Sequence, residues 1–261
     1  MRRVAAAAVT AFLALGATQG PSESPAFTAK EIPNPIREAV TAADRPEADK
    51  ALDAGRQPEQ MLAFFGISPN MKVADLFAGG GYTTELLARV VGPGGKVYSQ
   101  EPVFPPELRA IEEAWAKRLI TPALAHVVVP IHKNLGDPDF QLAPDGSLDA
   151  VVINMNYHDL VLQKLDRAKI NATVLRALRH GGVYGIVDHS AKPGAGDAAL
   201  QLHRIDQGFL TSEVEQAGFK LAGASAALRH PDDDRTWSTS PRTAGEKRGT
   251  SDRFMLRFVK P

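Results

Sequence analysis

Two places in the sequence hold side chains that could move a proton during a reaction. Tyr157-His158-Asp159 follows an apolar run, and His189 follows a second apolar run directly after Asp188. Histidine has an ordinary pKa of about 6.5, so it can accept a proton near neutral pH. We therefore predict that His158 is a general base and that Tyr157, Asp159 and His189 are further catalytic candidates. The alternative is that His158 only caps the helix that follows it.

A glycine-rich turn and an acidic residue beyond it could bind a nucleoside. The turn consists of Ala78, Gly79, Gly80 and Gly81. Glycine lacks a Cβ, so such a turn can approach a ligand closely, and the helix behind it offers free N–H groups. Glu101 stands about 20 residues further on, a spacing that suits a carboxylate accepting hydrogen bonds from both hydroxyls of a ribose. The turn lacks the G-x-G-x-x-G pattern of NAD-binding proteins.

These side chains need a scaffold, and the sequence around them predicts alternating strands and helices. Apolar runs that predict buried strands occur at 73–77, 96–100, 126–129, 148–153 and 183–187. Apolar residues with helical spacing occur at 82–91, 105–119 and 167–179. This alternation predicts a doubly wound α/β fold with a mostly parallel sheet. Ligands of such sheets bind at the carboxyl ends of the strands, where the residues named above are expected.

The last part of the chain departs from this alternation. A helix is predicted at 209–218, and apolar runs at 221–228 and 254–259 predict an antiparallel hairpin at the sheet edge. The polar stretch between these strands includes Asp232-Asp233-Asp234, which we interpret as a solvated loop. His203-Arg204-Asp206, before the helix, could bind an acidic acceptor or tie this part of the chain together.

The N-terminus is predicted to be an export signal. Arg2 and Arg3 precede an apolar run from 4 to 17, which is shorter than the roughly 20 residues that span a bilayer. We predict a signal peptide at 1–20 and a periplasmic mature chain without a membrane span; the alternative is an uncleaved start on a cytoplasmic or membrane-tethered protein. Residues 21–57 are predicted to be a linker and an N-terminal helical arm, with no clear period before residue 45. The main domain is predicted at 58–261.

The composition excludes several classes of function. The chain has 261 residues, 30 Lys+Arg against 30 Asp+Glu, and no Cys. Without Cys there are no disulfides, thiolate metal sites or Cys nucleophiles. Nucleic acid is not an expected partner, because proteins that bind it usually carry a basic excess. No ligand spacing in the sequence supports a metal at His158, Asp188 and His189, so no metal site is predicted.

Several of these stretches, taken in order, resemble one enzyme family. The run Val73 to Tyr82 resembles motif I of class I S-adenosylmethionine-dependent methyltransferases, and Glu101 resembles the ribose-binding acid of their motif II. The run 148–154 resembles their fourth strand, and 176–188 resembles the helix, Gly-Gly turn and fifth strand that follow. The closing hairpin is similar to theirs as well. Asn-Tyr-His-Asp at 156–159 resembles a small group of predicted exported methyltransferases.

The resemblance implies a seven-stranded methyltransferase sheet, S-adenosylmethionine as cofactor, and methyl transfer to a small-molecule or envelope acceptor. It implies that the cofactor contacts residues at strand ends and in the glycine turn, namely Asp75, Ala78, Gly79, Gly80, Gly81, Glu101 and Asn154. Phe77 departs from the family, because it stands where the usual motif has its first glycine, whose conformations phenylalanine is not expected to adopt. The alternative is an exported, non-enzymatic binding protein that kept the fold and lost or altered the cofactor site.

Overall fold

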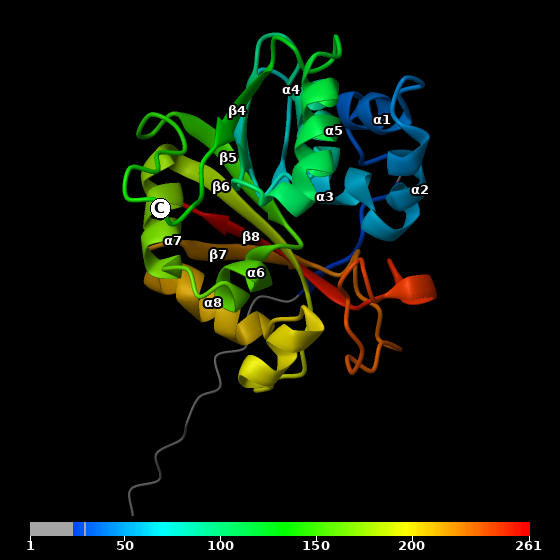
Figure 1. Cartoon of the computed structure of the whole chain (residues 1–261), viewed down its shortest axis with the longest axis vertical. Coiled ribbons are helices and arrows are strands. Elements are labelled where there is room, and N and C mark those ends of the chain that lie inside the picture. Colours follow the sequence, from blue (N-terminus) through cyan, green and yellow to red (C-terminus); the bar gives the residue numbers. More distant parts are fainter. Residues whose placement is uncertain (1–22, 29) are drawn as a thin grey trace, which may run out of the picture.

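The computed structural model describes residues 23–28 and 30–261, so the predicted signal peptide at 1–20 lies outside the described residues. Export therefore stays a prediction from the sequence. The described chain is built around one sheet with the strand order β1-β7-β8-β6-β5-β2-β3-β4 (Figure 1). The strands are β1 (Glu23–Ser24), β2 (Lys72–Leu76), β3 (Lys96–Glu101), β4 (Val128–His132), β5 (Leu148–Asn154), β6 (Leu178–His189), β7 (Lys220–Ser225) and β8 (Arg253–Val259). Strands β2 to β6 run parallel, whereas β8 is antiparallel to both β6 and β7.

Helices cover both faces of this sheet (Figure 1). They are α1 (Asn34–Thr41), α2 (Glu47–Arg56), α3 (Pro58–Phe65), α4 (Tyr82–Val91), α5 (Arg109–Leu119), α6 (Tyr157–Leu162), α7 (Arg167–Ala177) and α8 (Gln207–Gln216), with short 3-10 helices η1 (Pro106–Leu108), η2 (Gly196–Leu202) and η3 (Gly245–Lys247). Apolar side chains of α6, α7 and α8 form a buried cluster on one face. Those of α1, α3, α4 and α5 form a second cluster on the other face. Within the described ranges, no helix combines the length and the apolar character that crossing a membrane requires.

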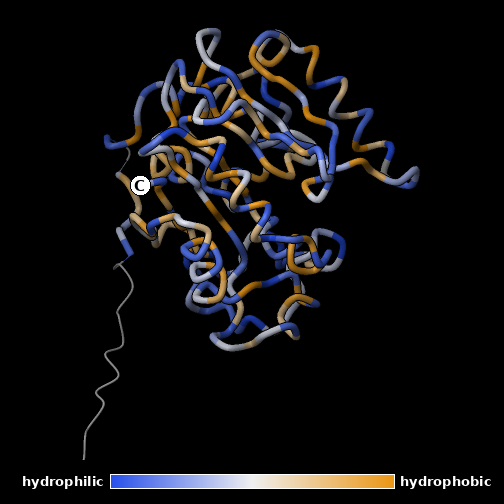
Figure 2. Tube along the Cα trace, turned by 90° about the vertical axis from the view of Figure 1, so that its left-hand side faces the viewer, coloured by the Kyte–Doolittle hydropathy of each residue, from blue (hydrophilic) through white to orange (hydrophobic). Residues whose placement is uncertain are grey.

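The alternation of side chains along each strand builds the two clusters. In β2, Ala74 and Leu76 belong to the first cluster, whereas Val73 belongs to the second. In β5, Val151 belongs to the first cluster and Val152 to the second. Because both faces of these strands are covered, the strands must be apolar throughout, which is why uninterrupted apolar runs mark them in the sequence. Along the surface helices, hydrophobic and hydrophilic stretches alternate instead (Figure 2).

The predicted doubly wound α/β fold with a C-terminal antiparallel hairpin is confirmed, since β7 pairs with β8 beside the parallel strands. The sheet has eight strands rather than seven, because the two residues of β1 pair with β7. The segment before residue 45 also contains α1, whose Ile36 and Ala39 are buried in the cluster that α4 shares. Two buried residues in one eight-residue helix give too short a pattern to reveal a period in the sequence.

Candidate active site

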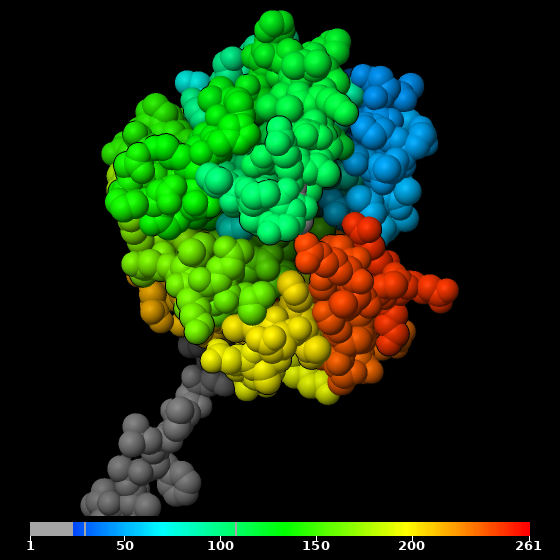
Figure 3. Space-filling view, in the orientation of Figure 1, coloured from blue at the N-terminus to red at the C-terminus, as the bar shows by residue number. Residues whose placement is uncertain are grey.

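A cavity of about 920 Å³ lies at the carboxyl ends of β2 and β5, the edge at which this class of fold binds ligands. Its walls come from α2, the glycine turn, the start of α6, and the segment 237–253. The helix α2 and this segment meet at the outer rim, where a Cβ on Gly55 would lie 3.1 Å from the Cα of Gly249. In Figure 3 the two parts lie next to each other, in blue and in orange-red. Segments from both ends of the chain thus enclose one site.

The glycine turn has a left-handed backbone at several residues, including Phe77, which stands where the methyltransferase motif has its first glycine. Phe77, Gly79 and Gly81 have φ angles of 55°, 58° and 81°. The expectation that phenylalanine would not adopt a glycine conformation is therefore wrong, although the left-handed region costs a residue with a side chain about 1–2 kcal/mol. The Phe77 N–H donates to Gln100 Oε1 (3.0 Å), and its side chain packs against the first core cluster. These contacts hold the strained residue in place.

Gly81 differs from its neighbours in what it faces. Ala78, Gly79 and Gly80 line the cavity, but Gly81 does not. A Cβ on Gly81 would lie 2.1 Å from Cζ3 of Trp115 in α5. The predicted cofactor contact of Gly81 is thus not supported by its position, and the residue is required by packing and by its positive φ.

We expect Gly81→Ala to destabilise the protein by about 3 kcal/mol, because the new methyl group overlaps Trp115 and the backbone is left-handed. The matched control is Gly80→Ala, since Gly80 has open space around its Cα and no left-handed φ. That variant should be as stable as the wild type or slightly more so. Urea denaturation of the three proteins measures the difference, and equal stability of the two variants would contradict the role assigned to Trp115.

Two buried carboxyl groups with raised pKa values, those of Glu101 and Asp75, lie near the turn. Glu101 ends β3, is 1% exposed, and neither of its carboxyl oxygens has a hydrogen-bond partner in the described part of the chain. Burial, followed by the nearby Asp75, raises its pKa to about 9. The backbone N–H of Gly79 faces the carboxyl group and offsets part of this increase, although it lies outside normal hydrogen-bond geometry. At neutral pH the group is therefore protonated, and it stands behind the cavity lining rather than in it.

Asp75, in contrast, lines the cavity. Burial raises its pKa to about 7, while the Thr84 hydroxyl, which donates to Asp75 Oδ2 (2.6 Å), works in the opposite direction. The carboxyl group is thus close to half ionised at neutral pH. A ligand cation or N–H donor next to it would favour the ionised form.

His158, Asp159 and His203 meet on the cavity wall. The Nδ1 atom of His158 lies 2.7 Å from Asp188 Oδ1, and the His158 backbone N–H donates to Asp188 Oδ2 (2.8 Å). On the opposite side of the ring, Nε2 lies 3.3 Å from His203 Nδ1 and 3.6 Å from Asp159 Oδ1. Burial opposes the charged ring, but Asp188 and Asp159 outweigh it and raise the pKa of His158. Burial and the charge of His158 lower the pKa of His203.

Asn154 and His189, both predicted site residues, also line the cavity. The Asn154 side-chain amide donates to Thr83 Oγ1 (3.1 Å), and His189 Nδ1 lies 2.8 Å from Ser251 Oγ. Burial, reinforced by His158, holds the pKa of His189 well below its usual value, so the ring is neutral. One ring nitrogen of His189 can therefore donate a hydrogen bond and the other can accept one, and the ring carries no charge.

Tyr157 is the predicted catalytic residue that the structure places elsewhere. Its side chain is fully buried in the first core cluster, and its hydroxyl accepts a hydrogen bond from Asn171 Nδ2 (2.9 Å) and donates to Glu213 Oε2 (3.3 Å). It does not belong to the cavity lining. The position of Tyr157 therefore does not support the predicted catalytic role, and its contacts join α6 to α7 and α8.

The sequence analysis missed the arginines of the cavity wall, among them Arg56, Arg248 and Arg253. Arg253 is buried and donates to the backbone carbonyls of Ser251 (3.2 Å) and Gly249 (3.1 Å), but to no carboxylate of the described residues. Burial and the charge of Arg56 lower its pKa to about 10. This side of the cavity is therefore positively charged, and no local pattern in the sequence indicates it.

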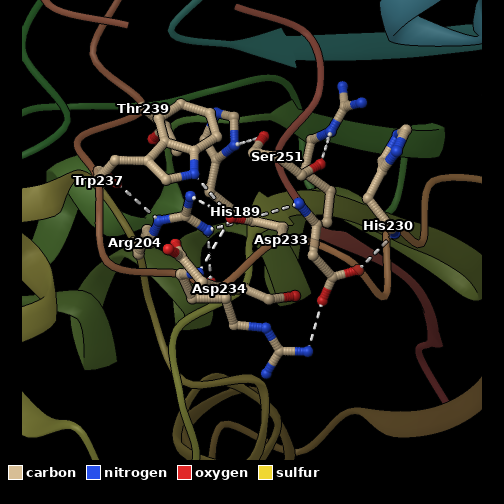
Figure 4. Close-up of polar contacts among 12 residues, drawn as sticks. His189, Arg204, His230, Asp233, Asp234, Trp237, Thr239 and Ser251 are labelled. Carbon is tan, nitrogen blue, oxygen red and sulfur yellow. Dashed lines mark hydrogen bonds and ion pairs between the residues drawn. The ribbon is translucent and has the colours of Figure 1, made fainter. Parts of the chain in front are cut away.

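A network of ion pairs fastens the covering segment, which we define as residues 229–252, over the cavity (Figure 4). The carboxylate of Asp233 accepts hydrogen bonds from Arg204 Nη1 (2.8 Å), the Trp237 ring N–H (2.8 Å) and the Asp252 backbone N–H (2.7 Å). The side chains of Arg204 and Asp233 are 0% and 1% exposed. The interpretation of Asp233 as part of a solvated loop is therefore wrong, and Arg204 ties this part of the chain together.

Comparisons with known proteins identify the architecture. No family model matches the sequence, and no curated protein matches it. Among solved structures, a SAM-dependent methyltransferase from Aquifex aeolicus is 17% identical over 87% of this chain and 99% of its own, with a TM-score of 0.58. Geranyl diphosphate methyltransferase in complex with SAM is 15% identical over 86% and 95% (TM-score 0.57). An arsenic(III) S-adenosylmethionine methyltransferase from Chlamydomonas reinhardtii is 17% identical over 87% and 73% (TM-score 0.54). The chain therefore has the fold of class I S-adenosylmethionine-dependent methyltransferases.

Proposed function

We propose that the protein is an S-adenosylmethionine-dependent methyltransferase that acts on a small, negatively charged acceptor. The observation that carries the proposal is the carboxyl group of Glu101, which is buried at the end of β3 without a partner for either oxygen in the described chain. A buried polar group without a partner costs on the order of 1–3 kcal/mol, so such a group usually serves a ligand. In a methyltransferase fold, this position suits the ribose hydroxyls of the cofactor.

The residues of the site fit the cofactor. Glu101 would accept hydrogen bonds from the ribose once the turn at Gly79 moves aside, and these donors would offset the burial and the Asp75 charge that raise the pKa of the free carboxyl group. Asp75 and Asn154 line the cavity on the side of β2 and β5 and would bind the amino-acid part. When bound, S-adenosylmethionine supplies a methyl group that is already activated on a sulfonium. The protein therefore has mainly to align the acceptor with it and to exclude water.

The acceptor is proposed to carry a negative charge. Arg56 lies over the Tyr82 ring, 4.2 Å from its centroid, and the nearby Arg248 and Arg253 contribute like charges to the same wall. Arg253 is buried, Arg56 is half-buried and Arg248 is exposed, and an anionic ligand would offset the repulsion among their like charges. The three guanidinium groups carry more positive charge than the single carboxylate of the cofactor can neutralise. A carboxylate or phosphate group on the acceptor would neutralise the remainder.

Titration calorimetry with S-adenosylmethionine tests the proposal. The wild type should bind one equivalent, and Glu101→Ala should bind at least about 10-fold more weakly, because it loses hydrogen bonds to a carboxylate that the ribose donors favour in its ionised form, worth about 1.5–3 kcal/mol. Glu107→Ala is the matched control, since Glu107 is exposed in the following segment, and it should bind like the wild type. If the wild type shows no heat at millimolar cofactor, or if both variants bind equally well, the non-enzymatic binding protein becomes the better explanation.

A further inference from the structure

The His158–Asp159–His203 cluster has a geometry that its proton chemistry does not require. The three candidate ligand atoms, His158 Nε2, His203 Nδ1 and Asp159 Oδ1, all face one another. They are separated by 3.3 Å between the two nitrogens, 3.6 Å from His158 to Asp159, and 3.8 Å from His203 to Asp159. A proton shared between the rings of His158 and His203 would explain the distance between the two nitrogens, but it would not explain why Asp159 Oδ1 lies close to both.

These separations fit a bound metal ion. The nearest point that is equidistant from the three atoms lies in their plane, about 2.1 Å from each, which is the length of a zinc–nitrogen or zinc–carboxylate bond. Neighbouring ligands of a tetrahedral zinc ion are about 3.4 Å apart, whereas neighbouring ligands of an octahedral ion are about 3.0 Å apart. The observed distances of 3.3, 3.6 and 3.8 Å are closer to the tetrahedral value, and the two pairs that involve Asp159 need to close by a few tenths of an ångström to reach it.

The surroundings of His158 are those of a metal ligand. Its Nδ1 atom lies 2.7 Å from Asp188 Oδ1, so Nδ1 carries the proton and Nε2 presents a lone pair to the centre of the cluster. A carboxylate that fixes the far nitrogen in this way is the usual partner of a metal-binding histidine. Asp188 is itself held by the backbone N–H groups of His158 (2.8 Å) and His189 (2.7 Å).

His203 is also positioned for this purpose. It follows η2 with a left-handed backbone, φ 52°, which is uncommon for a residue with a side chain. The Thr239 hydroxyl donates to its backbone carbonyl (2.7 Å), so the covering segment fixes it in place. The cavity lies on the open side of all three residues, and three protein ligands with one open position are typical of catalytic zinc sites.

We infer that His158, Asp159 and His203 bind a zinc ion, with Asp188 as the residue that orients His158. The metal site stands on its own geometry; its use, to hold an oxygen or nitrogen atom of the acceptor at the open position, rests on the proposed function. A metal on Nε2 excludes His158 as the general base, because the same lone pair cannot accept a proton. The metal would then promote the deprotonation of the acceptor that the sequence analysis assigned to His158, because it would lower the pKa of a bound hydroxyl group.

The test is a zinc titration of the full chain, free of affinity tags and stripped with a chelator, in competition with a chromophoric chelator. We expect one equivalent of zinc, and at least 100-fold weaker binding for Asp159→Asn and for His203→Asn. Asparagine keeps the shape of the first residue and tolerates the left-handed backbone of the second. Asp188→Asn should weaken zinc binding about 10- to 100-fold. The control His126→Ala, in an exposed position outside the cavity lining, should bind zinc like the wild type.

The outcomes are separable from those of the cofactor titration. Zinc bound with equal affinity by the wild type, Asp159→Asn and His203→Asn would overturn the site, whether or not S-adenosylmethionine binds. So would a stoichiometry that falls with His126→Ala, which would indicate adventitious binding by surface histidines. X-ray absorption on the zinc-loaded chain should show nitrogen and oxygen ligands at about 2.0–2.1 Å, and a shell of water oxygens alone would also overturn it.

Discussion

Replacing Glu101 by glutamine should make the protein more stable, and the gain should grow with pH. Burial and Asp75 raise the pKa of this carboxyl group from 4.5 to about 9 in the folded protein. Between these two values the folded state holds a proton that the unfolded state has released, so its stability falls as the pH rises. The fall is at most about 1.4 kcal/mol per pH unit. Glutamine does not titrate, so we expect Glu101→Gln to exceed the wild type by on the order of 3 kcal/mol at pH 8.

Urea denaturation at pH 5 and pH 8 measures this effect. The two proteins should differ little at pH 5, because most of the wild-type stability is still present just above the unfolded pKa. Glu107→Gln, in the exposed segment that follows β3, should show no such pH-dependent gain. A difference between Glu101→Gln and the wild type that is the same at both pH values would contradict the assignment of a buried, protonated carboxyl group.

Asp233→Asn should destabilise the protein by about 3–5 kcal/mol, the usual cost of removing one partner of a buried ion pair. Asp233 is the acidic partner of Arg204, and the two side chains are 1% and 0% exposed. The asparagine would leave the Arg204 charge buried and would replace two acceptors by one. The substitution should also loosen the active site, because Thr239 of the covering segment donates a hydrogen bond to the His203 backbone carbonyl.

The neighbouring residue provides the control. Asp234 is exposed, and its hydrogen bonds are local, to Thr236, whose N–H donates to it (3.0 Å), so Asp234→Asn should change stability by less than about 0.5 kcal/mol. Both variants keep size and shape, and chemical denaturation at neutral pH compares them directly. Equal losses at the two positions, or none at either, would show that the Arg204–Asp233 pair does not fasten the segment.

The fold was predictable where burial is complete and less so at the edge. The strand β5 is apolar along almost its whole length because both faces are covered, and its predicted bounds of 148–153 nearly match those observed. Among the described strands, β4 pairs with β3 alone and is mostly exposed, so it can include Pro130 and His132. Its apolar residues therefore mark its position poorly, and the prediction of 126–129 began and ended too early.

The site was predictable only as far as local spacing determines it. Asp75, Gly79 and Asn154 follow from their places at strand ends, and all three line the cavity. Tyr157 and His158 are consecutive residues at the start of α6, about 100° apart around the helix axis, so one of them can face the core while the other faces the cavity. The sequence does not tell which of the two does, because the answer depends on where Asp188 lies.

Asp233 shows the remaining limit. In the sequence it stands between two other aspartates, and all three look equally suited to solvent. Only the position of Arg204, on a distant part of the chain, makes the middle one a buried anchor. Long-range pairs of this kind leave no periodic or spacing signal, and the same holds for Arg56 and Arg253.

The contact between Gly55 and Gly249 bears on how a reactant reaches the site. It joins α2 to a segment near the opposite end of the chain through backbone atoms alone. A contact without side chains gains little from burial or hydrogen bonding. The Arg204–Asp233 ion pair lies elsewhere in the covering segment, and its buried charges resist separation. We therefore expect the wall of the site to separate more readily where the two glycines meet than at Asp233.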